Sequence, residues 1–140
     1  MGEDRGDLRT FTRAMVDSGA HVVLGHGPHV ARAMEFYKGQ LIAYSMGNFA
    51  TYGRFNLQGA QGLGMVLEVE LDARGRFLSG RILPTRQQGE GIVVPDEKAG
   101  VISLVRKLTA KDFPQTGAQV AEDGTLSPRG KQKLSAEGAP

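Results

Sequence analysis

The segment spanning residues 7–24 constrains the fold most, because it joins a helix pattern directly to an apolar strand pattern. Asp7 can cap the helix and Gly19 can end it. The apolar side chains that recur at helical spacing between them are Leu8, Phe11 and Met15. The apolar run at residues 22–24 follows at once and is typical of a strand buried on both faces of a sheet. A helix followed closely by such a strand is half of an α/β unit, so we predict an α/β fold.

Two hairpins and a second helix are predicted further along the chain. Residues 31–37 and 40–45 are rich in aromatic and aliphatic side chains and flank a turn at Lys38-Gly39. A second hairpin is expected around the turn at residues 72–75, where apolar and acidic side chains alternate in the preceding strand. The glycine-rich stretch between the hairpins predicts a long loop of the kind that is often functional. Residues 96–111 carry an apolar stripe that predicts the second helix.

The order of these elements suggests one incomplete domain. A chain of 140 residues can build one core. We place residues 1–113 in that domain and predict a disordered tail over residues 114–140, which are rich in Gly, Pro, Ser and charged side chains. A strand buried on both faces needs neighbours that the hairpins do not obviously supply. We therefore expect the chain to begin inside a larger fold.

Composition excludes several classes of function. There is no cysteine, so disulfides and thiolate metal sites are excluded. The formal net charge is only +2, with acidic and basic residues interspersed, so we expect no nucleic-acid partner. No apolar run is long enough to cross a bilayer, so we expect no membrane segment within this sequence.

All three histidines lie in one short segment, and this clustering marks the candidate site. His26 and His29 belong to the loop GHGPHV, residues 25–30, which we call the histidine loop. Histidine is the commonest side-chain ligand of divalent transition metals, and the loop follows a strand end, where α/β sheets usually place their sites. Two imidazoles are too few, because a catalytic metal needs three or more protein ligands. The alternative is that both are surface residues of a turn. His21 is interpreted as a residue at the start of the strand.

A second motif, YSMGNF at residues 44–49, follows the first hairpin. Ser45 and Asn48 in this motif are candidate substrate-binding residues that could contact a phosphate or a sugar hydroxyl near the histidine loop. The alternative is that Gly47 and Asn48 form a turn and that Ser45 caps the end of a strand.

Taken together, these blocks resemble the C-terminal part of the CapA (poly-gamma-glutamate capsule biosynthesis) proteins. The resemblance runs from about residue 17 to residue 57 and fades towards residue 85. It rests on Gly19-Ala20, Gly25-His26, Pro28-His29-Val30, Lys38-Gly39 and the YSMGNF motif, in the order and spacing that the family shows.

The resemblance implies a fold and a chemistry. CapA proteins are similar to calcineurin-like metallophosphoesterases, so it implies part of a two-sheet α/β/β/α sandwich, with this chain as its C-terminal half. Active members of that superfamily bind two divalent metals, and a metal-bridging hydroxide attacks phosphorus. By the resemblance, His26 and His29 are ligands of divalent metal ions, Mn, Zn or Fe. The resemblance implies two such ions in a complete parent protein and none in a fragment that lacks the other ligands.

Two departures from the family pattern leave the function open. The middle histidine of the pattern G-H-H-P-H is replaced by Gly27, and the upstream metal-binding blocks are missing. The first hypothesis is a metal-dependent, phosphoesterase-like hydrolase of capsule biosynthesis, of which this chain alone is inactive. The second is a non-enzymatic scaffold or polymer-binding subunit. A generic sheet-rich binding module is a weaker third. The expected partner is a cell-envelope polymer or a phosphate-containing small molecule, and the expected location is the cell envelope.

Overall fold

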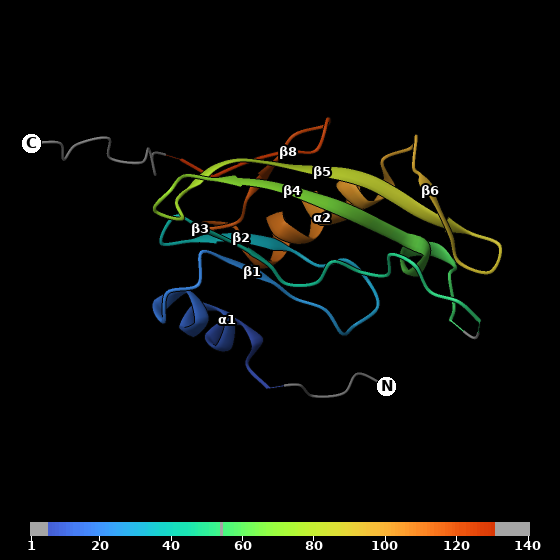
Figure 1. The fold of residues 1–140 in the computed structure, drawn as a ribbon, viewed down its shortest axis with the longest axis horizontal. Helices are drawn as coiled ribbons and strands as arrows, with labels where there is room; N and C mark the ends of the chain where they lie inside the picture. Colours follow the sequence, from blue (N-terminus) through green and yellow to red (C-terminus); the bar gives the residue numbers. More distant parts are fainter. Residues whose placement is uncertain (1–5, 54, 131–140) are drawn as a thin grey trace, which may run out of the picture.

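The computed structural model describes residues 6–53 and 55–130 and has a mixed α/β architecture (Figure 1). The prediction of an α/β fold with two sheets is confirmed. In chain order the elements are α1 (Leu8–Asp17), β1 (Val22–Leu24), β2 (Met34–Tyr37), β3 (Gln40–Ala43), the 3-10 helix η1 (Gly59–Gly62), β4 (Leu63–Leu71), β5 (Phe77–Gln88), β6 (Ile92–Pro95), α2 (Gly100–Asp112), β7 (Gln119–Val120) and β8 (Thr125–Ser127).

The first sheet has three strands in the order β1-β3-β2. The strands β2 and β3 form the predicted hairpin, and its turn residues Lys38 and Gly39 both have positive φ, 50° and 81°. Positive φ at both central positions is the conformation that matches the twist of a two-residue hairpin. The strand β1 runs parallel to β3, with Val23 opposite Ile42.

The second sheet is built around the long strand β5. Its main path is β4-β5-β8-β7, and β6 pairs with β5 beyond that path. The predicted hairpin around residues 72–75 joins β4 to β5. The two sheets face each other, since the rings of Phe36 in β2 and Phe77 in β5 meet edge to face with centroids 4.8 Å apart.

Alternation along β2 and β3 divides the side chains of the first sheet between two environments. One face joins the main core with the second sheet and α2; it presents Met34, Phe36, Leu41 and Ala43. The opposite face packs against α1 and the end of α2, through Ile42, Tyr44, Val16 and Phe113. The order α1, first sheet, second sheet agrees with part of an α/β/β/α sandwich, and α2 contacts strands of both sheets.

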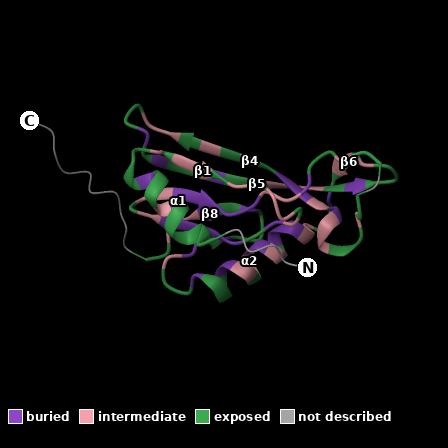
Figure 2. Cartoon of the chain, turned by 90° about the horizontal axis from the view of Figure 1, so that it is seen from below, coloured by how far each residue is buried: buried purple, intermediate pink, exposed green. Residues whose placement is uncertain are grey.

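The helix α1 forms as predicted, but its apolar stripe faces outward. Asp7 caps it, because its carboxylate accepts a hydrogen bond from the backbone N–H of Thr10 at 3.0 Å. The residues that α1 buries are Thr12 and Val16, whereas Phe11 in the predicted stripe is 58% exposed. Figure 2 shows α1 mostly exposed on the outside of the molecule, with the buried residues gathered between the sheets and α2.

The strand β1 departs from its predicted environment. It was expected to be buried on both faces, yet Val22 and Val23 are only half-buried and Leu24 is 53% exposed. The physical reason is its place at the edge of the sheet: among the described strands it pairs with β3 alone. The apolar run correctly predicts a strand, but it wrongly predicts that the strand lies in the middle of the sheet.

The prediction of a disordered tail from residue 114 is wrong for residues 114–130. Ala118, Val120 and Leu126 are buried in the main core, and β8 pairs with β5. These apolar side chains are spaced too widely among polar ones to produce a periodic signal in the sequence. Residues 131–140 lie outside the described part of the chain.

No helix within residues 6–53 and 55–130 combines the length and the apolarity that crossing a bilayer requires.

Candidate functional site: the histidine loop

The histidine loop lies against the chain that continues from β3. The Gly25 N–H donates to the carbonyl oxygen of Ala43 at 2.8 Å, and the Gly25 carbonyl accepts from the N–H of Met46 at 3.0 Å. Just beyond the loop, the Arg32 N–H donates to the carbonyl of Ser45 at 3.1 Å. These backbone bonds bring GHGPHV and YSMGNF together, although about twenty residues separate them in the sequence.

Glycines in both motifs are required by this close approach. A Cβ atom on Gly25 would lie 2.4 Å from the carbonyl oxygen of Tyr44. Gly47 has a φ of 74°, and a Cβ there would lie 3.0 Å from the backbone nitrogen of Ala31. Since backbone atoms on both sides leave no room, larger side chains would separate the two motifs.

His29 is the histidine that makes a side-chain contact with the second motif. Its Nδ1 atom lies 2.8 Å from Oδ1 of Asn48, and its ring centroid lies 5.2 Å from that of Phe55. His29 itself has a φ of 57°, a left-handed conformation that is uncommon outside glycine. Asn48 is buried, and its Nδ2 donates to the carbonyl oxygen of Gln61 in η1 at 3.0 Å.

The other predicted site residues have different surroundings. Ser45 is buried, and its hydroxyl accepts a hydrogen bond from the N–H of Gly47 at 3.3 Å, which favours the interpretation that it caps the strand end. His26 is exposed on the histidine loop, as is His29, but no side-chain contact of His26 corresponds to that between His29 and Asn48 among the described residues. His21 stands just before β1, and its ring occupies the space where a Cβ of Gly75 would be, as expected of a residue at the start of a strand.

The donor chemistry of the histidine loop suits a divalent metal, but the number of donors falls short. His26 and His29 offer imidazole nitrogens, which Zn, Mn and Fe accept. Among the described residues there is no group of three or more His, Asp or Glu side chains that could hold a metal ion. A complete site would therefore need ligands from outside residues 6–53 and 55–130.

A buried carboxylate on the opposite face of the first sheet escaped the sequence analysis. Glu35 in β2 is fully buried and pairs with Arg13 of α1. Its carboxylate also accepts hydrogen bonds from the hydroxyl of Tyr44 at 2.8 Å and from that of Thr116 at 2.5 Å. We call Glu35, Arg13, Tyr44 and Thr116 the Glu35 network.

The Glu35 network shifts the ionisation of two of its members. Burial alone would raise the pKa of Glu35, but the hydrogen bonds from Arg13, Thr116 and Tyr44 outweigh it and leave that pKa below its ordinary value. Burial, together with the adjacent carboxylate of Glu35, raises the pKa of Tyr44 to about 12. A lone Glu in the apolar run RAMEFY was the available signal, since a charge there is buried only with partners.

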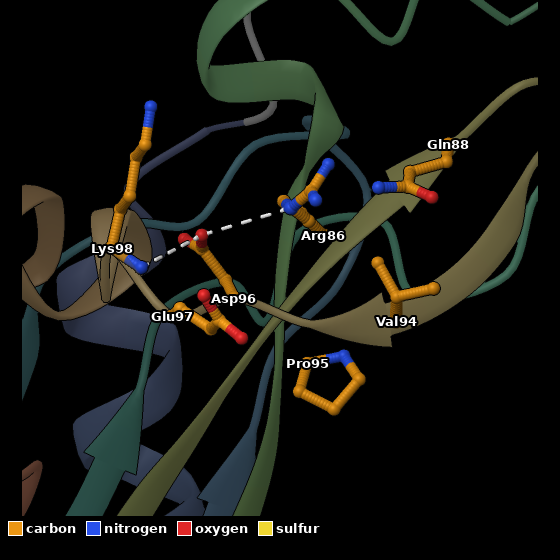
Figure 3. A pocket seen from close by; sticks show the side chains of 7 residues that line it. All are labelled: Arg86, Gln88, Val94, Pro95, Asp96, Glu97 and Lys98. Atoms are coloured by element: carbon orange, nitrogen blue, oxygen red, sulfur yellow. Dashed lines mark hydrogen bonds and ion pairs between the residues drawn. The ribbon is translucent and has the colours of Figure 1, made fainter.

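A polar cavity of about 540 Å³ lies beside the start of α2 (Figure 3). Its wall consists of Arg86, Gln88, Val94, Pro95, Asp96, Glu97 and Lys98. The carboxylate of Asp96 accepts from the Gly100 N–H at 2.7 Å and lies 3.9 Å from Nε of Arg86. Asp96 thus pairs with Arg86 and accepts a hydrogen bond from the start of α2. The cavity shares no lining residue with the histidine loop.

Comparison with known proteins places the histidine loop in a family. The family model of the bacterial capsule synthesis protein PGA_cap matches residues 4–52. This segment is similar to the CapA-type capsule synthesis proteins. The match includes both the histidine loop and YSMGNF, so the predicted resemblance is confirmed.

Curated proteins that are similar to this segment come from several bacteria. The PGA biosynthesis protein CapA of Bacillus subtilis (strain 168) is 51% identical over 41 residues, which are 29% of this chain and 11% of that protein. The capsule biosynthesis protein CapA of Bacillus anthracis is 51% identical over 39 residues, 28% of this chain and 10% of that protein. An uncharacterized protein of Sinorhizobium fredii is 46% identical over 41 residues. The similarity thus spans about a tenth of the length of each relative.

Proposed function

We propose that the chain is part of a CapA-type protein that acts in the biosynthesis of a capsule polymer. The observation that carries the proposal is the joining of two CapA motifs into one local structure, in which His29 contacts Asn48. The names of the two Bacillus relatives refer to capsule or PGA biosynthesis, and they are 51% identical to this chain over 41 and 39 residues.

Within that role, His26 and His29 are proposed as ligands of a divalent metal, Mn, Zn or Fe. Residues outside the described ranges would complete the ligand set, and by the superfamily resemblance a second metal would bind beside the first. A bound metal of this kind polarises a phosphoryl oxygen and lowers the pKa of a coordinated water. The substrate class that fits is a phosphate-containing small molecule or a cell-envelope polymer, with the protein acting at the cell envelope.

Metal titration of histidine variants tests this proposal. We would follow Zn²⁺ and Mn²⁺ binding by calorimetry for the 140-residue chain and for a longer polypeptide that contains it. We expect binding in the longer polypeptide to be lost in His26→Ala and in His29→Ala. His21→Ala is the matched control, because His21 lies outside the loop. Undiminished metal binding and activity in both loop variants would show that the ligand assignment is wrong.

A second candidate function is a non-enzymatic scaffold or polymer-binding subunit. Gly27 favours it, because this position carries a histidine in the family pattern and here has a φ of 130°, which side-chain-bearing residues rarely adopt. In that case poly-gamma-glutamate would bind equally well to wild-type protein and to the His26→Ala, His29→Ala double variant. Loss of polymer binding in the double variant would favour the metal-dependent function.

A further inference from the structure

A continuous chain of hydrogen bonds connects η1 to the histidine loop through Asn48. The carbonyl oxygen of Gln61 accepts from Nδ2 of Asn48 at 3.0 Å. On the other side of the same amide, Oδ1 lies 2.8 Å from Nδ1 of His29. Both polar atoms of Asn48 are thereby used within the chain, and its side chain is only 4% exposed.

The direction of each bond follows from the chemistry of the groups. A backbone carbonyl can only accept, so the amide nitrogen of Asn48 must face Gln61. The amide oxygen then faces His29 and can only accept as well. The ring nitrogen Nδ1 of His29 must therefore carry the hydrogen.

We propose that Asn48 is a positioning residue that holds His29 in its Nδ1–H tautomer and so presents an unprotonated Nε2 for coordination. A neutral imidazole carries one N–H, so a hydrogen fixed on Nδ1 leaves the lone pair on Nε2. Metal-bound histidines commonly donate their other N–H to a fixed acceptor in this way. The tautomer follows from the hydrogen bonds alone, whereas the coordination of a metal by Nε2 rests on the proposed function.

His29 is exposed on the loop, and two side chains contact its ring. Its backbone adopts the left-handed conformation, which is uncommon in a residue other than glycine. The ring of Phe55 lies against it on one side, and the buried amide of Asn48 holds its Nδ1. A substrate-binding role for Asn48 fits less well, because its side chain is buried and each polar atom of its amide already has a partner within the chain.

Nitrogen NMR of the histidine rings tests the tautomer directly in the metal-free chain. Only three histidines are present, so ¹⁵N-histidine labelling gives a simple spectrum, and His21→Gln and His26→Gln assign it by deletion. In alkaline buffer, where imidazoles are neutral, we expect Nδ1 of His29 to resonate as a protonated nitrogen and Nε2 as an unprotonated one. The opposite assignment in the wild type would overturn the proposal.

Two substitutions of Asn48 separate positioning from simple packing. Asn48→Leu keeps the size of the side chain but removes the acceptor, and we expect His29 to shift to the Nε2–H tautomer, which an unrestrained ring prefers. Asn48→Asp keeps an acceptor, so we expect the Nδ1–H tautomer to remain. If Asn48→Leu stays folded and His29 keeps its tautomer, or if Asn48→Asp folds and loses it, the proposal is wrong.

A Zn²⁺ titration with the metal alone as probe examines the coordination step. In the longer polypeptide we expect Asn48→Leu to weaken Zn²⁺ binding by about 10- to 100-fold, the usual effect of losing such a partner. Unchanged affinity would overturn the role of Asn48 in coordination. Absence of Zn²⁺ binding in the wild type, with the tautomer as expected, would instead count against the proposed metal function.

Discussion

The two faces of the first sheet differ in what they bury. One face contributes only apolar side chains to the core, whereas the other also buries a charged group. Towards the second sheet, Met34 and Leu41 are fully buried in a cluster with apolar side chains of that sheet and of α2. Towards α1, the same strands bury a carboxylate, and the helix above turns its apolar stripe outward. One face is held by a large apolar cluster, whereas the other combines a smaller apolar cluster with hydrogen bonds to one buried charge. Apolar spacing in a helix therefore indicates which side chains share a face, but not which way that face points.

The largest change in the free energy of unfolding is expected for a substitution on the apolar face of the first sheet. Leu41→Ala removes a fully buried side chain from the main core, and we expect the free energy of unfolding to fall by about 2–5 kcal/mol. Chemical denaturation measures the change. The comparison between the faces would fail if the loss were below about 1 kcal/mol, the scale of a surface substitution.

Glu35→Gln tests the charged face and carries a pH signature. Tyr44 and Thr116 keep a weaker acceptor but Arg13 loses its ion pair, so we expect a loss of about 1–3 kcal/mol at neutral pH. Because the folded pKa of Glu35 lies below its ordinary value of 4.5, its contribution is present above that value and is lost as the pH falls through the folded pKa. Wild type and variant should converge in stability in acid. A difference that stays constant down to the acid limit would contradict the lowered pKa.

Thr116→Val isolates a single bond of the Glu35 network. The substitution removes the hydroxyl that donates to Glu35 at 2.5 Å and keeps the shape of the side chain. We expect a loss of about 1 kcal/mol. Thr125→Val is the control, because it removes an exposed hydroxyl whose partner is the exposed carboxylate of Asp123 rather than a buried one. Equal stability of the two variants would indicate that residue 116 adds nothing to the charged face.

The smallest effect is expected on the outward stripe of α1. Phe11→Gln replaces an aromatic side chain that is 58% exposed, so we expect the free energy of unfolding to change by less than about 0.5 kcal/mol. Denaturation of the 140-residue chain measures it. A loss above 2 kcal/mol would mean that the stripe is covered in solution.

Local sequence patterns predicted the helices and strands well, but they predicted poorly which side chains are buried. The helix cap at Asp7 and the turn at Lys38-Gly39 depend only on residues close by in the sequence, so both were predicted correctly. The exposure of Leu24 depends instead on which strands lie beside β1, and no local pattern reports that. The burial of Leu126 likewise depends on pairing with β5, more than forty residues away.

The sequence singled out candidate site residues but not the contacts between them. The family spacing singled out His29 and Asn48 together, yet nothing in the sequence indicated that one is hydrogen-bonded to the other. Glu35 was missed because its partners come from α1, from the end of β3 and from residue 116. Hydrogen bonds of this kind depend on the orientation of side chains, which residue types and spacing leave undetermined.

The ordered segment from residue 114 to residue 130 changes where the chain can be cut. The family match ends at residue 52, but the strands that the matched segment packs against extend to residue 127. Trimming the chain to the recognisable segment would leave Met34 and Phe36 without their cover, and trimming at residue 113 would remove Val120 and Leu126 from the same core. A fragment that keeps the residues of this core together is therefore more than twice as long as the segment that matches the family.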